Sequence, residues 1–258
     1  MKISITQNRL YTMISIVSII VLWKFLSIWV DNPIMIPSPE STVMEFIKII
    51  KSKNFTITVL ATLTRVIIGF SISFISALIL GFSSGFFKPV YYLLRPVIII
   101  QKATPTMAII LLSIIWLKAQ WAPILVGFLI IFPIIYSNVI QGIESVDIKL
   151  IEMARVYKLS QLTVMKDIYI PSIKSSLTSV ASATIGLNLK VIIAAEVLSQ
   201  PNVSIGTNFQ MEKANLNTAG VFAWALVSII IAGGFDLVIR VFKSYNIKHK
   251  IDCCKNSH

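Results

Sequence analysis

Residues 121–140 read WAPILVGFLIIFPIIYSNVI, twenty positions without one charged side chain. A run of about 20 predominantly apolar residues has the length that a helix needs to cross the hydrocarbon core of a bilayer. The stretch therefore predicts a transmembrane helix, and the rest of the chain can be compared with it.

Composition extends this prediction to the whole chain. Of the 258 residues, 56% are hydrophobic and 13% are charged, with a mean hydropathy of +0.83. The charged share is about half of the roughly 25% that is usual for soluble domains. One soluble core of this size fills before the apolar residues run out, so the excess is expected to face lipid. We predict an all-α membrane protein with about six transmembrane helices in one domain, 1–258, and no large soluble domain.

Apolar runs of similar length set the expected spans, which lie near 13–30, 66–86, 96–116, 121–140, 175–198 and 220–242. The first run follows Lys2 and Arg9, as a signal peptide would, but no small-residue cleavage site follows it. It is therefore expected to be a retained span. Pro105 lies inside the third run and is expected to kink or split that helix. Between the first two spans, Val43, Phe46, Ile47 and Ile50 recur at helical spacing and predict an amphipathic helix on a membrane surface.

Basic residues indicate the orientation. The formal charge of +12 is concentrated in short loops, the pattern that orients membrane proteins, so nucleic acid is not an expected partner. If both termini are cytoplasmic, 14 of the 23 Lys and Arg residues fall on the inner side and five on the outer side. The remaining four, Lys24, Arg65, Lys102 and Lys190, lie within or at the edges of spans. We therefore predict a multi-pass protein with both ends inside.

The longest inner loop, 141–174, carries two short helical patterns. Apolar residues recur after Asp147 and again after Ser160, and both residue types are common N-caps. The two sets are Ile148, Ile151 and Ala154, then Leu162, Met165, Ile168 and Tyr169. The pattern fits a helix-turn-helix that a partner protein binds and through which it transmits movement. It also fits a solvated loop with incidental helicity.

The loop resembles a motif of binding-protein-dependent ABC importer permeases, E-A-A-x3-G-x9-I-x-L-P. Glu152, Ala154, Ile168 and Pro171 match it at the right spacing, whereas Met153, Lys158 and Ile170 depart from it. Lys158 stands where the motif has glycine. If the turn there needs a positive φ, a lysine side chain costs about 1 kcal/mol.

Further matches resemble the nitrate, sulfonate and taurine branch of this family and cover nearly the whole chain. Residues 36–39 read IPSP where the branch has LPSP, and residues 63–70 read LTRVIIGF where it has SLxRxxxGF. Residues 103–108, ATPTMA, resemble its LPxxA break, and residues 195–198, AEVL, resemble AExL. The following SIG at 204–206 resembles GLG and departs at its first two positions.

The resemblance implies a permease subunit of an ATP-driven importer in a bacterial plasma membrane. Its solute would be small and anionic, similar to sulfonate, nitrate or taurine, or similar to a thiamine precursor. The implied partners are cytosolic ATPase subunits, a second permease copy and an extracytoplasmic substrate-binding protein. The residues implied to couple to the ATPase are Glu152, Met153, Ala154, Lys158, Ile168 and Pro171.

The chain is not expected to be an enzyme or to bind a cofactor. It contains no G-x-x-x-x-G-K-[ST] loop, so ATP and magnesium would bind to the partner subunit. No spacing of metal ligands is visible, and both histidines lie in the C-terminal tail. Gly81 and Gly85 instead form a small-xxx-small pattern, which predicts close helix packing.

Ionisable residues within spans are candidates for the translocation path, since a central charge is costly in a bilayer. Lys190 is the leading candidate because it lies too deep to reach the surface comfortably, although an ion pair with another helix is the alternative. Glu196 is about 240° around the same helix, so the two cannot pair on one face. Lys102, beside Pro105, either lies near an inner gate or extends its amine to the interface.

Two other functions remain open on the residues alone. A stand-alone channel or secondary carrier is the first, although such proteins often show repeats with paired broken helices. Here only one break is visible. A membrane enzyme is the second, and it lacks a recognisable catalytic cluster.

Overall fold

The computed structural model describes the backbone of residues 5–255, and the side-chain surroundings of residues 11–238 except 175 and 236. Every regular element in that range is helical. The order is α1 (Ile5–Val30), α2 (Pro39–Lys51), α3 (Phe55–Phe86), α4 (Lys88–Ala103), α5 (Thr106–Trp116), α6 (Ala122–Glu144), α7 (Ile148–Val156), α8 (Gln161–Val164), the π-helical turn η1 (Met165–Tyr169), α9 (Ile170–Ser199), α10 (Ile205–Ala214) and α11 (Thr218–Lys255).

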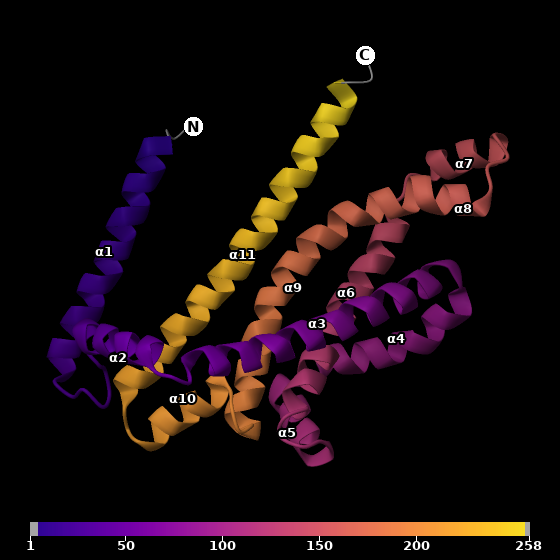
Figure 1. Ribbon diagram of the computed structural model, residues 1–258. Coiled ribbons are helices and arrows are strands. Elements are labelled where there is room, and N and C mark those ends of the chain that lie inside the picture. The colour runs from indigo at the N-terminus through magenta and orange to yellow at the C-terminus, as the bar shows by residue number, and fades with distance from the viewer. Residues whose placement is uncertain (1–4, 256–258) are drawn as a thin grey trace.

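Five of these helices are long and apolar enough to cross a membrane, and α4 with α5 makes a broken sixth. The fold class predicted from composition is therefore confirmed. The ends of α1 and α11 that carry the chain termini lie on the same side of the molecule as α7 and α8 (Figure 1).

The third predicted span, 96–116, is not one helix. α4 ends at Ala103, α5 begins at Thr106, and the two helices meet at 104°. Pro105 lies at the bend with φ −58° and ψ 135°, an extended conformation that cannot continue a helix. The split expected at Pro105 is confirmed, whereas the predicted start at residue 96 is wrong, because α4 begins at Lys88.

The second predicted span, 66–86, begins too late. α3 starts at Phe55, and its 32 residues extend for about 48 Å, so it crosses at a slant to α1 and α11 (Figure 1). The prediction stopped at Arg65 because a charge normally marks the edge of a span. Inside the fold this arginine is neutralised by a buried carboxylate, so the helix continues past it.

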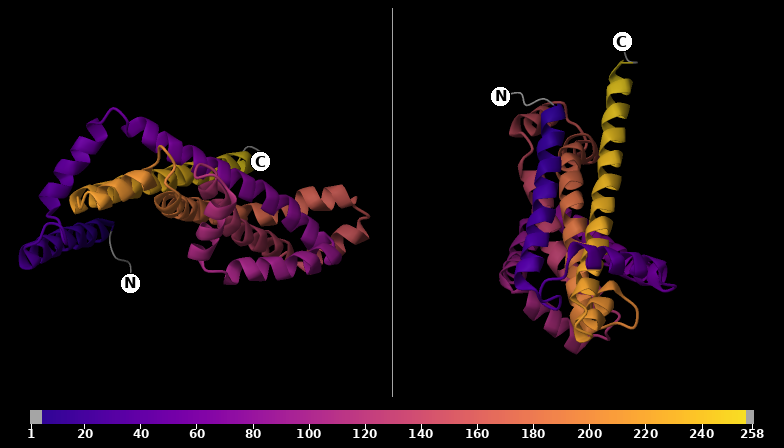
Figure 2. Two further views of the ribbon diagram at one scale, coloured as in Figure 1. Left: turned by 90° about the horizontal axis from the view of Figure 1, so that it is seen from below. Right: turned by 90° about the vertical axis from the view of Figure 1, so that its left-hand side faces the viewer.

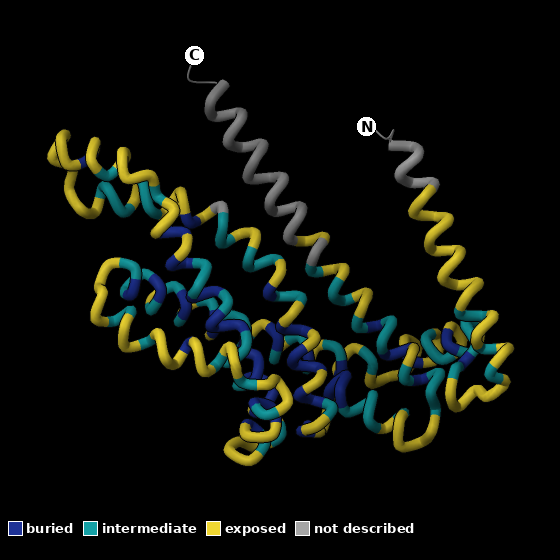
Figure 3. Tube along the Cα trace, turned by 180° about the vertical axis from the view of Figure 1, so that it is seen from behind, coloured by how far each residue is buried: buried dark blue, intermediate teal, exposed yellow. Residues whose placement is uncertain are grey.

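Helix α6 is the centre of the molecule and α1 is its periphery. Of the most apolar 18 residues in each helix, 61% are buried in α6 and none in α1. Residues of α3, α4 and α9 pack around α6 in one apolar cluster, and residues of α5 and α9 pack against it in another. Figure 2 shows α1 at the edge of the molecule, and the residues of α1 from 11 to 22 are exposed in Figure 3.

The amphipathic helix predicted after residue 41 is present as α2, but it turns a different face to the protein. Thr42 and Ile49 are buried and Phe46 packs against the same cluster, which includes residues of α11. Val43, Ile47 and Ile50, which were expected to face the membrane, are about half exposed and not packed inside the protein. Two sides of this helix are therefore apolar, one for the protein and one open to its surroundings.

Close packing of α3 on α6 depends on the two glycines of the small-xxx-small pattern, which confirms that prediction. A Cβ on Gly81 would lie 2.8 Å from Cβ and Cγ1 of Val139, and one on Gly85 would lie 2.3 Å from Cδ1 of Ile143. Val139 is branched at Cβ and cannot move aside by rotating its outer atoms.

We therefore expect Gly81→Ala to destabilise the protein by about 1–3 kcal/mol, the usual cost of overpacking. The matched control is Gly233→Ala, because no atom lies within 4 Å of a Cβ at Gly233. Thermal unfolding of the purified chain in detergent should show a lower midpoint for Gly81→Ala and an unchanged or higher one for Gly233→Ala. Equal midpoints for the two variants would contradict this account of the α3–α6 contact.

Candidate functional site

The helices of the inner loop begin at the residues that the sequence suggested. The Asp147 carboxylate accepts a hydrogen bond from the Lys149 amide at 2.9 Å and caps α7. The Ser160 hydroxyl accepts one from the Thr163 amide at 3.2 Å and caps α8. Each cap satisfies an amide that the first turn of a helix leaves without a partner. We call α7, α8 and their connection, residues 148–164, the helical hairpin.

The turn between α7 and α8 uses the backbone conformation that favours glycine. Lys158 has φ 51°. Its amide donates to the Arg155 carbonyl, and the next amide, of Leu159, donates to the Ala154 carbonyl, both at 3.0 Å. This pair of hydrogen bonds is a Schellman motif, whose left-handed residue is usually glycine. The turn therefore does need a positive φ at Lys158, and the lysine carries a strain of about 1 kcal/mol.

Pro171 shapes the junction between the hairpin and the membrane. It is the second residue of α9 and has no amide hydrogen, so it cannot donate to the Asp167 carbonyl. Just before it, the Ile170 amide donates to the Met165 carbonyl, five residues back, which forms the π-helical turn η1. Since α8, η1 and α9 follow one another without a gap, one continuous helical rod extends from the hairpin to Ser199.

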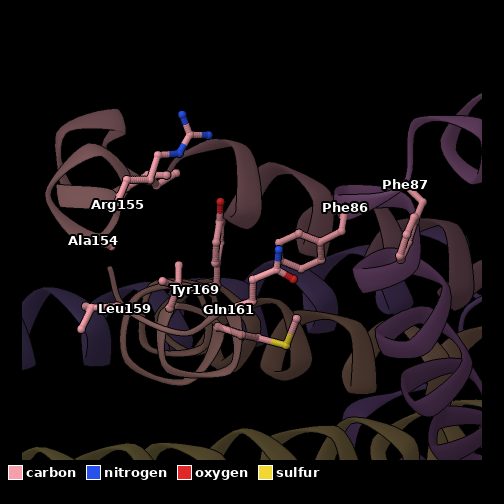
Figure 4. Close-up of a pocket in the computed structure, with 10 residues that line it drawn as sticks. Phe86, Phe87, Ala154, Arg155, Leu159, Gln161 and Tyr169 are labelled. Carbon is pink, nitrogen blue, oxygen red and sulfur yellow. The ribbon is translucent and has the colours of Figure 1, made fainter. Parts of the chain in front are cut away.

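A cavity of about 510 Å³ separates the hairpin from the turn between α3 and α4 (Figure 4). Phe86 and Phe87 line one side, and Ala154 and Leu159 line the other. Tyr169 closes the space between them, and its ring meets that of Phe86 edge to face at 5.0 Å. Ala154 is 1% exposed, which explains why a small residue occupies this motif position.

The outer surface of the hairpin is apolar and uncovered. Its exposed large residues are Ile148, Leu150, Met153, Val156, Tyr157, Leu159 and Leu162. Val156 and Leu162 are about 80% exposed, although the hairpin lies between the candidate spans and outside them. Glu152 and Lys158 are also exposed, and within the described residues Glu152 makes no ion pair. Ile168 is half-buried and Pro171 is exposed.

Glu196 lies at a buried junction of three helices. It is fully buried, its Oε1 accepts from Arg65 at 2.8 Å, and its Oε2 accepts from the Thr62 hydroxyl at 3.0 Å and the Gly206 amide at 3.2 Å. Arg65 also donates to the Val203 carbonyl at 3.1 Å. A carboxylate with this set of partners has a structural role, and we do not include it in the solute path proposed below.

Gly206 permits this junction by its size. A Cβ at this position would lie 2.4 Å from Cβ of Glu196 and 2.5 Å from the Val197 nitrogen. Reasoning from sequence had not paired Glu196 with Arg65 or Thr62, which lie more than 130 residues earlier. The pairing could have been suspected, because Arg65 and Glu196 are opposite charges within or beside apolar helices, where each needs a partner.

Lys190 and Lys102 have no acidic partner within the described chain. Lys190 is exposed on α9 and makes no ion pair or hydrogen bond to a described residue. Exposed residues recur along the same face of α9, at Ala183, Leu187, Lys190, Ala194 and Leu198. Lys102 lies at the end of α4, next to the Pro105 break, and donates to the Ser137 hydroxyl of α6 at 2.6 Å. The structure does not bring Lys190 and Lys102 into contact with one another.

We expect Lys158→Gly to stabilise the helical hairpin by about 1 kcal/mol, because glycine adopts the left-handed conformation without strain. Hydrogen exchange of the amides at residues 157–159, followed by mass spectrometry, should slow by roughly fivefold. Lys149→Gly is the control, since Lys149 lies in α7 with ordinary helical geometry and glycine there should speed exchange. Faster exchange in Lys158→Gly would show that the lysine side chain contributes more than the strain costs.

Comparison with known proteins identifies the family. Residues 77–244, more than half of the chain, match the family described as "Binding-protein-dependent transport system inner membrane component". A putative aliphatic sulfonates transport permease protein of Escherichia coli is 32% identical over 238 residues, which cover 89% of each chain. The taurine transport system permease protein of the same organism is 23% identical over 229 residues, covering 86% of this chain and 82% of the relative.

Two further comparisons agree with this result. The nitrate import permease protein of Leptolyngbya laminosa is 28% identical over 187 residues, covering 72% of this chain and 65% of the relative. Among solved structures, the crystal structure of an amino acid ABC transporter with histidines superposes with a TM-score of 0.64 at 14% identity, covering 79% of this chain and 94% of that one. This last likeness concerns the fold. The chain belongs to the binding-protein-dependent transport family of inner-membrane components, as a multi-pass permease subunit of an ABC importer and not as an enzyme.

Proposed function

We propose that the chain imports a small anionic solute, of the sulfonate, taurine or nitrate kind, as one of two identical permease copies. A cytosolic ATPase, which binds the ATP and magnesium, grips the helical hairpin and drives alternating access. An extracytoplasmic protein delivers the solute. The relatives' names support the solute class, because several of them are named for taurine, aliphatic sulfonates or nitrate.

The observation that carries the ATPase contact is the uncovered apolar surface of the hairpin. Exposed apolar residues within spans face lipid, but those of the hairpin lie outside the spans and would otherwise face water. A concentrated patch of this kind marks a surface for a protein partner. Glu152, exposed and without an ion pair, supplies a charge that fixes the orientation of such a contact.

Transmission of the partner's movement is supported by the continuity of α8, η1 and α9. A displacement of the hairpin acts directly on α9, because no flexible loop separates them. The Phe86–Tyr169 contact also ties η1, which directly follows the hairpin, to the end of α3. The same movement is thereby passed to two spans at once.

A positive site for the solute is supported by Lys190. It lies nine residues before the end of α9, about 14 Å along the helix axis, and its exposed face of α9 is not covered by the chain itself. A cation at this depth without a partner is costly unless it has a function or a partner from another copy. We propose that the face containing Lys190 lines the path and attracts an anionic solute.

The coupling proposal predicts that Glu152→Lys loses the ATPase. The tagged chain should be purified from its native membrane in mild detergent, with bound ATPase measured by activity and by mass spectrometry. We expect at least a tenfold lower yield of ATPase, because the reversal replaces an attraction by repulsion at the contact. Lys118→Glu, a charge reversal in the exposed loop after α5, is the control and should retain the ATPase. Equal recovery of ATPase with Glu152→Lys and with the unaltered chain would exclude Glu152 from the contact.

The path proposal predicts that Lys190→Ala reduces solute uptake by tenfold or more while the ATPase still co-purifies. Lys190→Arg should retain part of the activity, since it preserves the charge, and Lys213→Ala, at the exposed end of α10, should behave as the unaltered protein. Uptake of labelled taurine into cells or proteoliposomes is the measurement. Normal uptake by an assembled Lys190→Ala complex would exclude the lysine from the path.

A further inference from the structure

A second cavity, of about 340 Å³, lies between α4 and the C-terminal half of α6. It is separate from the cavity beneath the hairpin and shares no lining residue with it. Its lining combines positive charge, hydroxyl groups and apolar side chains, which is the mixture typical of small-molecule sites. The lining residues are Tyr91, Arg95, Ile98, Ile99, Lys102, Tyr136, Ser137, Ile140, Gln141 and Glu144.

Two cations enter this cavity from one face of α4. Arg95 and Lys102 are seven residues apart, which places them on the same side of the helix and about 10 Å from one another along its axis. Neither forms an ion pair with a described acidic residue. Their charges are therefore available to a ligand.

Lys102 is held in the cavity by a neutral partner. Its amine donates to the Ser137 hydroxyl at 2.6 Å, and that hydroxyl in turn donates to the Pro133 carbonyl at 2.8 Å. A lysine that simply extends to the interface has no need of a hydrogen bond across to a neighbouring helix. The amine instead keeps two donors free, because an ammonium group has three.

The apolar and acidic residues of the lining indicate how a ligand would be oriented in the cavity. Ile98 and Ile140 are buried apolar side chains, and Tyr136 is fixed by a 2.8 Å hydrogen bond from its hydroxyl to Ser84. Glu144, the one carboxylate of the lining, lies seven residues beyond Ser137, about 10 Å along α6. The end of the cavity next to Lys102 is therefore positive, and the middle is apolar.

We propose that this cavity binds a small organic oxyanion, one that carries a single sulfonate-type group on a short apolar body. The oxyanion contacts Lys102, because charge-assisted hydrogen bonds to such groups are strong, and the apolar body lies against Ile98 and Ile140 in the direction of Arg95. The site is a resting place on the cytoplasmic side of the path, inward of the Pro105 break. Its place in transport rests on the proposed function, but its capacity to bind an anion does not.

A phospholipid phosphate has the same oxyanion chemistry, and the test separates it from a free solute. The whole complex, in detergent freed of lipid, is treated with acetic anhydride in the presence of increasing butanesulfonate. Acetylation of each lysine is read by mass spectrometry. Lys88, exposed at the start of the same helix and outside the cavity, is an internal control in the same sample.

We expect butanesulfonate to protect Lys102 and not Lys88. Arg95→Gln should raise the half-protecting concentration by about tenfold, because it removes a positive charge about 10 Å from the oxyanion, whereas Lys88→Gln should leave it unchanged. A parallel sample in nanodiscs with phosphatidylglycerol and no sulfonate identifies the headgroup. Protection found there and not with butanesulfonate would overturn the proposal in favour of lipid.

Equal modification of Lys102 at every sulfonate concentration would also overturn it, as would protection that is the same for Lys88. The assay needs neither ATP nor a working ATPase. If butanesulfonate protects Lys102 but the Glu152 and Lys190 variants behave as the unaltered protein, the anion site stands and the proposed roles of Glu152 and Lys190 in import fail. If Lys102 is not protected but the Glu152 and Lys190 variants lose function as predicted, the anion site fails and the proposed function stands.

Discussion

The buried ion pair between Arg65 and Glu196 determines where three helices of this protein meet. Glu196 is fully buried, and an isolated carboxylate in that position would cost several kcal/mol. Arg65 of α3, the Thr62 hydroxyl beside it and the Gly206 amide of α10 together supply its partners. Thr62 also accepts from the Ile205 amide at 3.0 Å, so the first turn of α10 is fixed by the same group. Removal of either charge would leave the other without an opposite charge in this junction, and this makes the junction cooperative.

This junction holds only the C-terminal end of α9. At its N-terminal end, α9 is preceded by η1 and the hairpin, whose exposed face nothing in the described chain covers. On the proposed function, a displacement of the hairpin therefore tilts α9 about its fixed end and does not translate it as a whole. Lys190, six residues before Glu196, is close to the fixed end and moves little. The inner half of the helix moves most.

The sequence predicted those features that depend on local chemistry. The spans followed from apolar runs, the helix starts from Asp147 and Ser160, and the break from Pro105, because each needs only a few neighbouring residues. The 104° bend itself could not be predicted, since proline ends a helix without fixing the direction of the next one. The π-helical turn was not predicted, because Pro171 was considered only as a match to the family motif. Its missing N–H, which removes a hydrogen bond from the helix, was not considered.

Features that join distant parts of the chain were missed for a different reason. The start of α3 was misplaced because Arg65 looked like the end of a span until its partner, 131 residues later, was known. The side of α2 that packs on the protein was not predicted, because only the tertiary fold shows that Thr42 and Ile49 are buried. Charge and hydropathy along the sequence show which side chains need a partner, and the tertiary fold decides which residue that partner is.

The four basic residues expected in or near the spans divide into two kinds, and this division bears on function. Lys24 forms an ion pair with Glu40 at 2.9 Å and joins α1 to α2, and Arg65 forms one with Glu196. These two charges are neutralised by the chain itself and hold its helices together. Lys102 and Lys190 have no such acid within the described residues, although a charge in a membrane span is equally costly for them. A protein whose cargo is an anion has a reason to keep two cations unpaired, because the cargo itself supplies the missing charge as it passes.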